Sequence, residues 1–475
     1  MTPVTTFRDR TVALFGLGGS GLSTAKALIA GGAHVCAWDD GEAGRLKAVA
    51  AGVPLMDLSR ADWPGFDALI LSPGVPLTHP EPHWTVGLAR AAGVAVIGDI
   101  ELFLRERAAH APGAPLIAIT GTNGKSTTTA LIAHILRTAG RDVQLGGNIG
   151  VPILDLEPPA DDRIHVIECS SFQIDLAPSL NPTIGLLLNI TPDHLDRHGT
   201  MENYAAVKER LVAGAEIALV GVDDAFTHAI GARLAARETE EKRTIPVSGV
   251  RALDWGFYVE DGAIFFRAEG HAPTEAEQIA TLAGARALRG DHNAQNAAFA
   301  CAAAWECGLE DEEIAAGLVS FPGLPHRMEE VGRIGRTLFI NDSKATNADA
   351  AEKALKSFSD IYWIIGGKAK EGGVEPLREL FPRIRKAYLI GAASDDFART
   401  LEGALPYERC ETLDVATTQA ALDALDSDAH EPIVLLSPAC ASYDQFANFE
   451  VRGDAFRALV HGLPAIVAAR RGGRQ

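Results

Sequence analysis

The sequence lacks any run of about 18 consecutive apolar residues, the length that a membrane-spanning helix requires. Its six cysteines form no C-x-x-C pair and no dense framework, so we expect reduced thiols in the cytoplasm rather than a disulfide scaffold. Residues 1–10 contain no basic segment followed by an apolar one, and we therefore expect no secretory signal. Positive charge is also scarce: 62 acidic residues face 43 basic ones, and the formal net charge of −19 argues against non-specific binding to nucleic acid.

The most informative segment that is present is Gly121–Thr127, with the sequence GTNGKST. It follows the apolar run 115–120 and precedes a helical pattern at 125–139. Glycines let the backbone curl so that its N–H groups point at phosphate oxygens, while lysine supplies a positive charge and the serine hydroxyl can bind Mg²⁺. The spacing is shorter than G-x-x-x-x-G-K-[ST], because Ile119 occupies the position of the first glycine. We predict a nucleoside triphosphate site; a glycine-rich turn without a ligand is the alternative.

Apolar strand patterns alternate with helical patterns in three successive blocks, as expected for parallel βαβ units. We predict an α/β fold with three sequential domains. These are a Rossmann-like N-terminal domain at 1–110, a central domain at 111–324 that resembles a P-loop ATPase with a mostly parallel sheet, and a Rossmann-like C-terminal domain at 325–475. Segment 105–115, with two prolines and a glycine, is predicted to be a linker, and residues 261–262 to form a hairpin turn.

The N-terminal block carries a second glycine loop. Gly16-x-Gly18-x-x-Gly21 follows a strand pattern, and Asp39 ends the next strand about 20 residues further on. This pattern places a phosphate group at a helix N-terminus and a sugar near Asp39. NAD satisfies these requirements and so does a UDP moiety, while a purely structural glycine turn is the third interpretation.

Charged and polar residues also follow strands in the other two blocks. Glu168 ends a strand of the second block, where a carboxylate beside the phosphate loop would hold Mg²⁺ directly or through water. His194 follows another strand of this block and is either a metal ligand or a structural side chain. Segments 341–347 and 437–446 close strands of the third block. They either bind a charged small molecule or only cap a helix and connect elements.

Seven short segments occur in one order along the whole chain: GTNGKST, ECSSFQ, TPDHLDRH, GDHNAQN, GLPHR, NDSKATN and LSPACASYDQF. Together they closely resemble the Mur ligases of peptidoglycan synthesis, which support cell-wall biogenesis and hence cell shape and division. The resemblance implies an ADP-forming amide ligase. In such an enzyme ATP phosphorylates a substrate carboxylate, an amine attacks the acyl phosphate, and phosphate leaves.

Within this family, the strings DSKATN and SPACAS resemble the ligases that add D-glutamate to UDP-N-acetylmuramoyl-L-alanine. Sister ligases for other amino acids and folylpolyglutamate synthases share the phosphate loop and remain alternatives. An NAD-dependent oxidoreductase would leave residues 121–127 unexplained, and a nucleotide-driven switch protein would leave the basic C-terminal loops unexplained. The resemblance further implies ATP and Mg²⁺ as cofactors, and a cytoplasmic monomer that binds no nucleic acid and inserts into no membrane.

The resemblance also assigns roles to individual residues. The expected catalytic residues are Lys125, Glu168, His194 and Lys208, of which Lys208 matches a lysine that is carbamylated in the family. The expected metal-site residues are Ser126, Glu168, His194 and Lys208. The expected ATP-binding residues are Gly121, Thr122, Asn123, Gly124, Lys125, Ser126, Thr127, Asn293, Asn296, Arg327 and Asp342. The UDP substrate is expected to bind Ser20, Asp39, Asp40, Ser72, Gly74, Asn148 and Gln173. The D-glutamate pocket is expected to contain Lys344, Thr346, Lys370, Ser442 and Phe449, with Lys368 as the alternative to Lys370.

Overall fold

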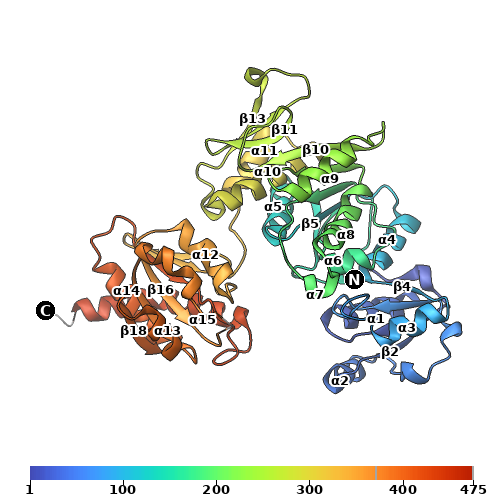
Figure 1. Cartoon of the computed structure of the whole chain (residues 1–475), viewed down its shortest axis with the longest axis horizontal. Helices are drawn as coiled ribbons and strands as arrows, with labels where there is room; N and C mark the ends of the chain where they lie inside the picture. The colour runs from blue at the N-terminus through green and yellow to red at the C-terminus, as the bar shows by residue number, and fades with distance from the viewer. Residues whose placement is uncertain (370–371, 473–475) are drawn as a thin grey trace. The chain divides into compact units, whose positions relative to one another are not determined.

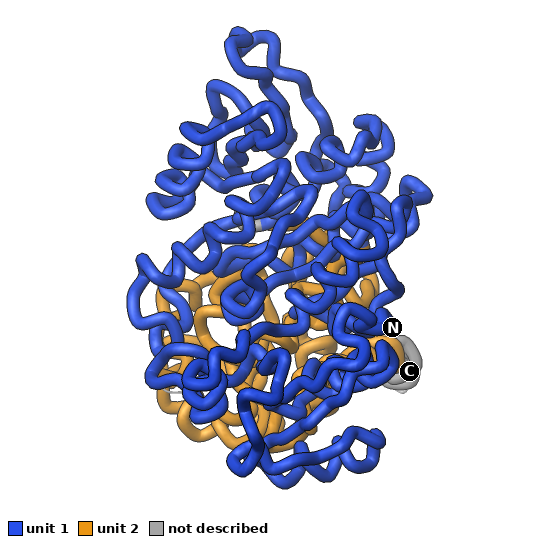
Figure 2. The backbone as a smooth tube through the Cα atoms, turned by 90° about the vertical axis from the view of Figure 1, so that its right-hand side faces the viewer, with its two compact units in different colours: residues 1–285, 291–321 blue, residues 286–290, 322–475 orange. Residues whose placement is uncertain are grey.

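The computed structural model describes residues 1–369 and 372–472, which contain three β-sheets in two compact units. Figure 2 distinguishes the two units by colour. The first comprises Met1–Ala285 and Asp291–Phe321, and the second comprises Arg286–Gly290 and Pro322–Gln475. The predicted α/β class is confirmed. The boundaries of the three predicted domains stay predictions, because the first unit contains both the first and the second sheet.

The first sheet is parallel and has the strand order β2-β1-β3-β4. Phe15 pairs with Trp38 and with Leu71, so the loops that follow these three strands lie at one edge of the sheet. From β1 the chain forms β2 on one side and then returns to form β3 on the other side of β1. Open parallel sheets bind ligands at such a switch point in strand order. The elements are β1 Thr11–Phe15, α1 Gly19–Gly31, β2 His34–Trp38, α2 Glu42–Ala50, β3 Ala68–Leu71, α3 Trp84–Ala91, β4 Ala95–Ile97 and α4 Asp99–His110.

Helix α4 occupies the first half of the predicted linker. The helix extends to His110, so the prediction of a linker at 105–115 is wrong for residues 105–110. Leu102, Phe103 and Leu104 are buried on this helix, and such burial stabilises it by about 25 cal/mol per Å² of apolar surface. The helix ends just before Pro112, because proline disfavours helical backbone in the residue that precedes it.

The second sheet has the order β13-β12-β11-β10-β9-β8-β5-β7-β6. Figure 1 labels four of its strands, β13, β11, β10 and β5. Neighbouring strands pair in parallel from β6 at one edge of the sheet as far as β11. The pairs β11–β12 and β12–β13 at the other edge are antiparallel. The predicted hairpin at 261–262 is confirmed, since Glu260 pairs with Ala263. The strands are β5 Leu116–Thr120, β6 Asp142–Gly147, β7 Arg163–Glu168, β8 Ile184–Leu187, β9 Ile217–Gly221, β10 Arg243–Ser248, β11 Gly256–Glu260, β12 Ala263–Arg267 and β13 Glu277–Thr281. The helices are α5 Lys125–Thr138, α6 Ser171–Asp175, α7 Leu195–His198, α8 Met201–Ala213, α9 Ala225–Ala235, α10 Asp291–Glu306 and α11 Asp311–Ser320.

The third sheet has the order β14-β15-β19-β16-β17-β18 and is parallel except for β14. The edge strands β14 and β18 are only partly buried and rich in charged residues, so they lack the apolar pattern that marks the central strands of this sheet. The strands are β14 Glu329–Ile334, β15 Thr337–Asn341, β16 Ile361–Gly366, β17 Ile384–Ile390, β18 Tyr407–Glu411 and β19 Ile433–Leu436. The helices are α12 Ala348–Ser357, α13 Ser394–Leu401, α14 Leu413–Leu425 and α15 Phe449–Gly472.

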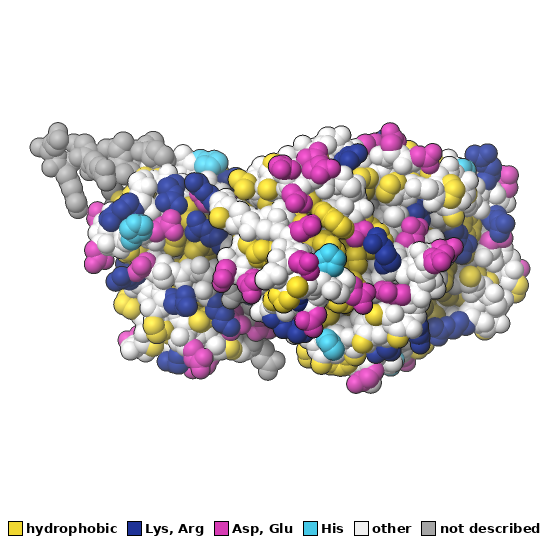
Figure 3. Space-filling model, turned by 90° about the horizontal axis from the view of Figure 1, so that it is seen from above, with side chains coloured by type: hydrophobic (Ala, Val, Ile, Leu, Met, Phe, Trp, Pro, Cys, Tyr) yellow, Lys and Arg dark blue, Asp and Glu magenta, His cyan; other side chains and the backbone are white. Residues whose placement is uncertain are grey.

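The remaining connections contain short 3₁₀ helices. These are η1 Thr5–Phe7, η2 Leu58–Arg60, η3 Trp63–Gly65, η4 Ile153–Asp155, η5 Pro273–Glu275, η6 Arg286–Leu288 and η7 Glu375–Arg383. None of the helices in the described part of the chain combines the length and the apolar character needed to cross a membrane. On the face that Figure 3 shows, acidic and basic side chains are interspersed.

Candidate functional site

The segment Gly121–Thr127 connects strand β5 to helix α5, as predicted. Gly124 adopts φ +84°, and a Cβ atom there would lie 2.2 Å from Oδ1 of Asn296, so the position requires glycine. Lys125 begins the helix, and its Nζ donates hydrogen bonds to two carbonyl oxygens of the loop at 3.0 and 2.9 Å. The ammonium group therefore lies over the loop, next to the N–H groups of the helix start that attract phosphate.

Two predicted ATP residues on helix α10 lie beside this loop. Nδ2 of Asn296 donates to Oδ1 of Asn293 at 3.0 Å, and Oδ1 of Asn296 accepts from Oγ1 of Thr128 at 3.2 Å. Both asparagines are buried. The structure thus brings Asn293 and Asn296 to the phosphate loop, although they lie far from it in the sequence.

Asn189 also holds the loop, and sequence reasoning missed it. Its carbonyl oxygen accepts from N of Thr122 at 2.8 Å, and its Oδ1 accepts from N of Asn123 at 2.8 Å. Its Nδ2 donates to Oε1 of Gln295 on α10 at 3.0 Å. Asn189 follows the apolar strand β8, and a polar residue at the end of such a strand was the available signal.

Glu168 ends β7 beside the phosphate loop, because it pairs with Ile119 of β5 in the sheet. The residue is 2% exposed; its Oε1 accepts from Nδ2 of Asn148 at 2.7 Å, and its Oε2 has no hydrogen-bond partner. Leaving a buried carboxylate oxygen unsatisfied costs free energy. A hard cation such as Mg²⁺ would satisfy this oxygen, so Glu168 fits the predicted metal site.

Lys208 on helix α8 also reaches the phosphate loop. It is 1% exposed, and its Nζ donates to the carbonyl oxygen of Gly121 at 2.8 Å and to Oγ1 of Thr120 at 3.2 Å. Burial lowers the pKa of Lys208 well below its usual value, and the nearby Lys125 ammonium lowers it further. The structure therefore brings Lys208 to the phosphate loop, as the resemblance implies.

His194 has a more exposed position. Its side chain is 49% exposed, packs against the ring of Phe172 at a centroid distance of 5.1 Å, and lies 3.4 Å from the Asp193 carboxylate. Within the described residues, no group of three or more His, Cys, Asp or Glu side chains is arranged to hold a metal ion. Glu168 and Lys208 lie at the loop. The metal-binding roles of all four residues, Ser126, Glu168, His194 and Lys208, stay predictions.

The second glycine loop connects β1 to α1. A Cβ atom at Gly21 would lie 1.8 Å from the carbonyl oxygen of Gly16, so this close turn requires glycine. The Asp39 carboxylate accepts from N of Leu17 at 2.6 Å and from N of Gly41 at 2.7 Å. The carboxylate that was predicted to bind a sugar therefore also holds the loop in place.

The other predicted UDP-substrate residues lie near these strand ends or near Glu168. Oγ of Ser72 donates to the carbonyl oxygen of Gly16 at 2.7 Å, and the Asp40 carboxylate lies 3.2 Å from Nε2 of His83. Arg197, which sequence reasoning missed, donates to the carbonyl oxygen of Gly74 at 3.1 Å. Asn148 contacts Glu168, and Gln173 lies on α6, which follows β7.

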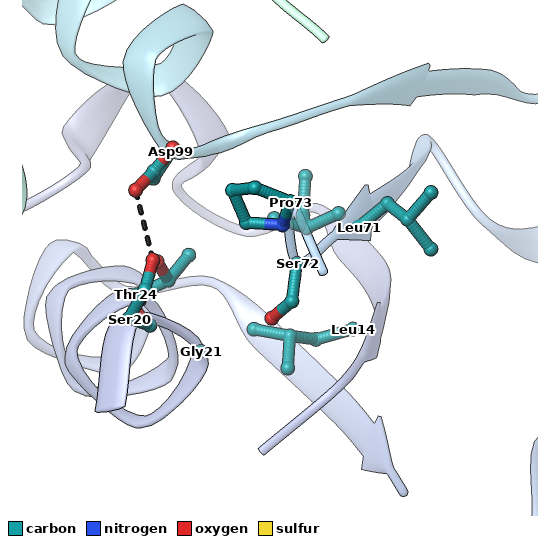
Figure 4. Close-up of a pocket in the computed structure, with 9 residues that line it drawn as sticks. Leu14, Ser20, Gly21, Thr24, Leu71, Ser72, Pro73 and Asp99 are labelled. Carbon is teal, nitrogen blue, oxygen red and sulfur yellow. Dashed lines mark hydrogen bonds between the residues drawn. The ribbon is translucent and has the colours of Figure 1, made fainter. Parts of the chain in front are cut away.

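Ser20 lines a small pocket beside the second glycine loop, together with Gly21, Ser72 and Asp99 (Figure 4). Its Oγ donates to Oδ2 of Asp99 at 2.8 Å, and Asp99 is the first residue of α4. Sequence reasoning assigned no role to Asp99.

The predicted D-glutamate residues belong to the second unit. Nζ of Lys344 lies 5.5 Å from the ring centroid of Phe449, and Ser442 is buried. N of Lys368 donates to the carbonyl oxygen of Ala441 at 2.9 Å, which joins its loop to the segment that contains Ser442. Thr346 lies in the same loop as Lys344. Lys370 lies outside the described residues.

Arg452 on α15 forms hydrogen bonds to both the loop that contains Lys344 and the segment that contains Ser442. It is 1% exposed; its Nε donates to Oγ of Ser343 at 2.9 Å, and its Nη2 donates to the carbonyl oxygens of Ser343 at 2.8 Å and Cys440 at 3.0 Å. Sequence reasoning missed Arg452, because no local pattern distinguishes a buried arginine from the exposed ones of a helix.

Asp342 closes strand β15 and is buried. It accepts from Oγ of Ser437 at 2.8 Å and from N of Met328 at 3.2 Å. Burial raises the pKa of Asp342 to about 7, although Arg327 acts in the opposite direction. Asp342 and Arg327 therefore lie near each other in the second unit, and their predicted contact with ATP stays a prediction.

Comparison with known proteins shows which family the chain resembles. Residues 119–304 match the Mur ligase middle domain, and residues 326–440 match the Mur ligase glutamate ligase domain. The UDP-N-acetylmuramoylalanine–D-glutamate ligase of Brucella abortus is 59% identical over 473 residues, which cover 99% of this chain and 100% of that protein. The ligase of the same name from Agrobacterium fabrum is 58% identical over 476 residues and covers 100% of both chains.

Solved structures with low sequence identity share the fold. The UDP-N-acetylmuramate-alanine ligase of Thermotoga maritima aligns with a TM-score of 0.56 at 16% identity, over 95% of this chain and 99% of that one. A UDP-N-acetylmuramoyl-L-alanyl-D-glutamate–2,6-diaminopimelate ligase aligns with a TM-score of 0.57 at 18% identity, over 97% of this chain and 94% of that one. With two matched domains and full-length relatives of this identity, the chain belongs to the Mur ligase family.

Proposed function

We propose that the chain joins D-glutamate to UDP-N-acetylmuramoyl-L-alanine in an ATP-dependent reaction of peptidoglycan precursor synthesis. The observation that carries this proposal is 59% identity over almost the full length to ligases named for this reaction. The phosphate loop with Lys125 above it and the buried Glu168 beside it is the machinery that such a reaction requires.

In this reaction, a carboxylate oxygen of the UDP-linked substrate attacks the γ-phosphorus of ATP, the bond from phosphorus to the β–γ bridging oxygen breaks, and ADP leaves. The amine of D-glutamate then attacks the acyl carbon, loses a proton, and phosphate leaves. Lys125 and the N–H groups at the start of α5 hold the β- and γ-phosphates in line with the attacking carboxylate. Asn293 and Asn296 position the nucleotide from α10.

The residues at the phosphate loop fit a Mg²⁺ ion. Ser126, His194, the Glu168 carboxylate and a carbamylated Lys208 would hold it, and the unpartnered Oε2 of Glu168 is the observation that supports this set. When bound, the cation neutralises negative charge on the phosphoryl group that is transferred.

The C-terminal loops supply the proposed pocket for D-glutamate. Lys344 and a lysine at 368 or 370 would pair with the two carboxylates of the amino acid, while Thr346 and Ser442 would donate hydrogen bonds. Phe449 packs beneath Lys344 and limits where its ammonium can lie.

We further propose that the chain acts as a monomer in the cytoplasm, where its nucleotide-linked substrate and ATP are dissolved. Arg327 and Asp342 would also bind ATP. Asp39, Asp40, Ser72 and Gly74 would hold the UDP moiety at the end of the first sheet, and Asn148 and Gln173 would contact the muramoyl part.

Phosphate release tests the proposal directly. Purified protein is given ATP, Mg²⁺ and UDP-N-acetylmuramoyl-L-alanine, and each candidate amino acid is added in a separate reaction. We expect phosphate release that depends on D-glutamate and on the UDP-linked substrate. Turnover with only a different amino acid, or hydrolysis without the UDP-linked substrate, would contradict it.

A further inference from the structure

Asp99 is a buried carboxylate that the proposed reaction leaves without a role. It is 4% exposed, and burial raises its pKa. In the part of the chain that the structure describes, no lysine, arginine or histidine forms an ion pair with it. Burying a carboxylate without a cation is costly, so the hydrogen bonds that it accepts must offset this cost.

One of these hydrogen bonds comes from Ser20, which is a predicted substrate-binding residue, and another comes from the backbone of the helix that Asp99 begins. Oδ2 accepts from Oγ of Ser20 at 2.8 Å (Figure 4), and Oδ1 accepts from N of Ile100 at 2.9 Å. The Gln173 side chain also acts on Asp99 as a hydrogen-bonding group, which lowers the pKa of the carboxyl and partly offsets the effect of burial. The Oε1 atom of Gln173 accepts hydrogen bonds from N and Oγ of Ser170, both at 3.1 Å, so its amide nitrogen is the side-chain group left to act on Asp99.

Ser20 and Gln173 lie on helices that follow strands of two different sheets. Ser20 lies in the first turn of α1, after the glycine loop of the first sheet. Gln173 lies on α6, which follows Glu168 at the end of β7 in the second sheet. Asp99 stands at the start of α4, the helix that connects the two sheets. Its carboxylate accepts a hydrogen bond from Ser20, and the Gln173 side chain stabilises the charged form of the same carboxylate.

We propose that Asp99 is a positioning residue for the UDP-linked substrate, one that sets the distance between its nucleotide end and its reacting carboxylate. This inference rests on the proposed function. Ser20 would hold the diphosphate and Gln173 the muramoyl part, so a carboxylate that fixes both side chains fixes where the substrate carboxylate stands relative to the phosphate loop. Asp99 itself touches neither substrate nor ATP.

The test compares Asp99→Asn with Glu101→Gln on the same helix. Glu101 is 2% exposed and also accepts hydrogen bonds from across the unit, from N and Oγ of Ser179 at 3.0 and 2.8 Å, but it contacts no predicted substrate residue. We expect Asp99→Asn to raise the KM for the UDP-linked substrate about tenfold with the KM values for ATP and D-glutamate unchanged. Glu101→Gln should leave all three KM values within about twofold while lowering thermal stability to a similar extent.

A double-mutant cycle with Ser20→Ala tests the coupling. If Asp99 acts through Ser20, Asp99→Asn in the Ser20→Ala background should change the KM by less than about threefold. An undiminished effect in that background, or equal KM changes in Asp99→Asn and Glu101→Gln, would overturn the inference. The wild-type enzyme is measured first: absence of D-glutamate-dependent turnover there refutes the proposed function, whereas wild-type turnover with an unchanged Asp99→Asn refutes only the role of Asp99.

Discussion

Two glycine loops in the first unit share a backbone arrangement and differ in charge. Each follows a buried strand, β1 or β5, and each ends where a helix begins. The loop at 121–127 contains Lys125, whose ammonium lies over it, whereas the loop at 16–21 contains no basic residue and is held by the Asp39 carboxylate.

This difference in charge indicates which role each loop is suited to. Backbone N–H groups and a helix N-terminus are enough to anchor a phosphate that does not react. A phosphoryl group in transfer also needs fixed positive charge, because negative charge is redistributed in the transition state. We therefore assign anchoring to the first loop and phosphoryl transfer to the second, and the predictions below separate the two roles.

The largest effect is expected for Lys125→Ala, which removes the charge that distinguishes the loops. We expect kcat to fall by about 1,000-fold or more, with binding of the UDP-linked substrate unchanged. Steady-state kinetics and calorimetry measure the two quantities. Lys26→Ala, an exposed lysine on α1, is the matched control and should alter neither. Loss of both activity and substrate binding in Lys125→Ala would refute the separation of roles.

Gly124→Ala should have the next largest effect. The added Cβ would lie 2.2 Å from Oδ1 of Asn296 at a residue with φ +84°. We expect kcat/KM for ATP to fall about 100-fold and the free energy of unfolding to drop by about 1–3 kcal/mol. At Gly18 a Cβ atom meets nothing within 4 Å and φ is −70°, so Gly18→Ala should preserve the KM for ATP and the stability. Equal losses in the two variants would show that the loops do not differ as described.

Asp39→Asn addresses the anchoring loop. The substitution weakens the hydrogen bonds from Leu17 and Gly41, and we expect the KM for the UDP-linked substrate to rise about tenfold with the KM for ATP unchanged. Asp67→Asn is the control, because Asp67 accepts from N of Thr11 at the opposite end of β1. A changed KM for ATP in Asp39→Asn would indicate that the two loops act as one site.

The smallest effect is expected on the pH dependence of the unfolding free energy, through Asp342 at the end of β15 in the second unit. Burial raises the pKa of Asp342 to about 7, above the value of about 4 in the unfolded chain. Between pH values of about 4 and about 7, Asp342 keeps its proton in the native chain and loses it in the unfolded chain. The contribution of Asp342 to the unfolding free energy therefore falls as pH rises through this range and does not change above it. Relative to wild type, Asp342→Asn should therefore gain about 3 kcal/mol in unfolding free energy between pH 5 and pH 8, measured by denaturant titration. A pH-independent difference would contradict this assignment.

The central strands and the phosphate loop could be predicted because their signals are local. A parallel strand buried on both faces is an apolar run, as in β5, where all five residues are buried. Edge strands such as β14 and β18 carry charged residues that face solvent, so their patterns resemble loops. The end of helix α4 was missed because Pro112 and Pro115, which follow its last residue, make 105–115 resemble a linker.

The contacts around the site were less predictable, because they join residues that are distant in the sequence. Lys208 and Thr120 are 88 positions apart, and Arg452 and Ser343 are 109 apart. Resemblance to a family pointed to Lys208, but no periodicity or motif pointed to Asn189, Arg452 or Asp99. Their roles depend on tertiary burial and on which hydrogen-bond partners the fold brings near.

Oxygen transfer tests the central claim, that the loop at 121–127 delivers the γ-phosphoryl group to a carboxylate and not to water. UDP-N-acetylmuramoyl-L-alanine labelled with ¹⁸O in its terminal carboxylate is turned over with ATP and D-glutamate, and the phosphate is analysed by mass spectrometry. Attack by the carboxylate predicts one ¹⁸O atom in each phosphate released. Unlabelled phosphate, with both ¹⁸O atoms left in the UDP-linked molecule, would show that water is the acceptor and would contradict the claim.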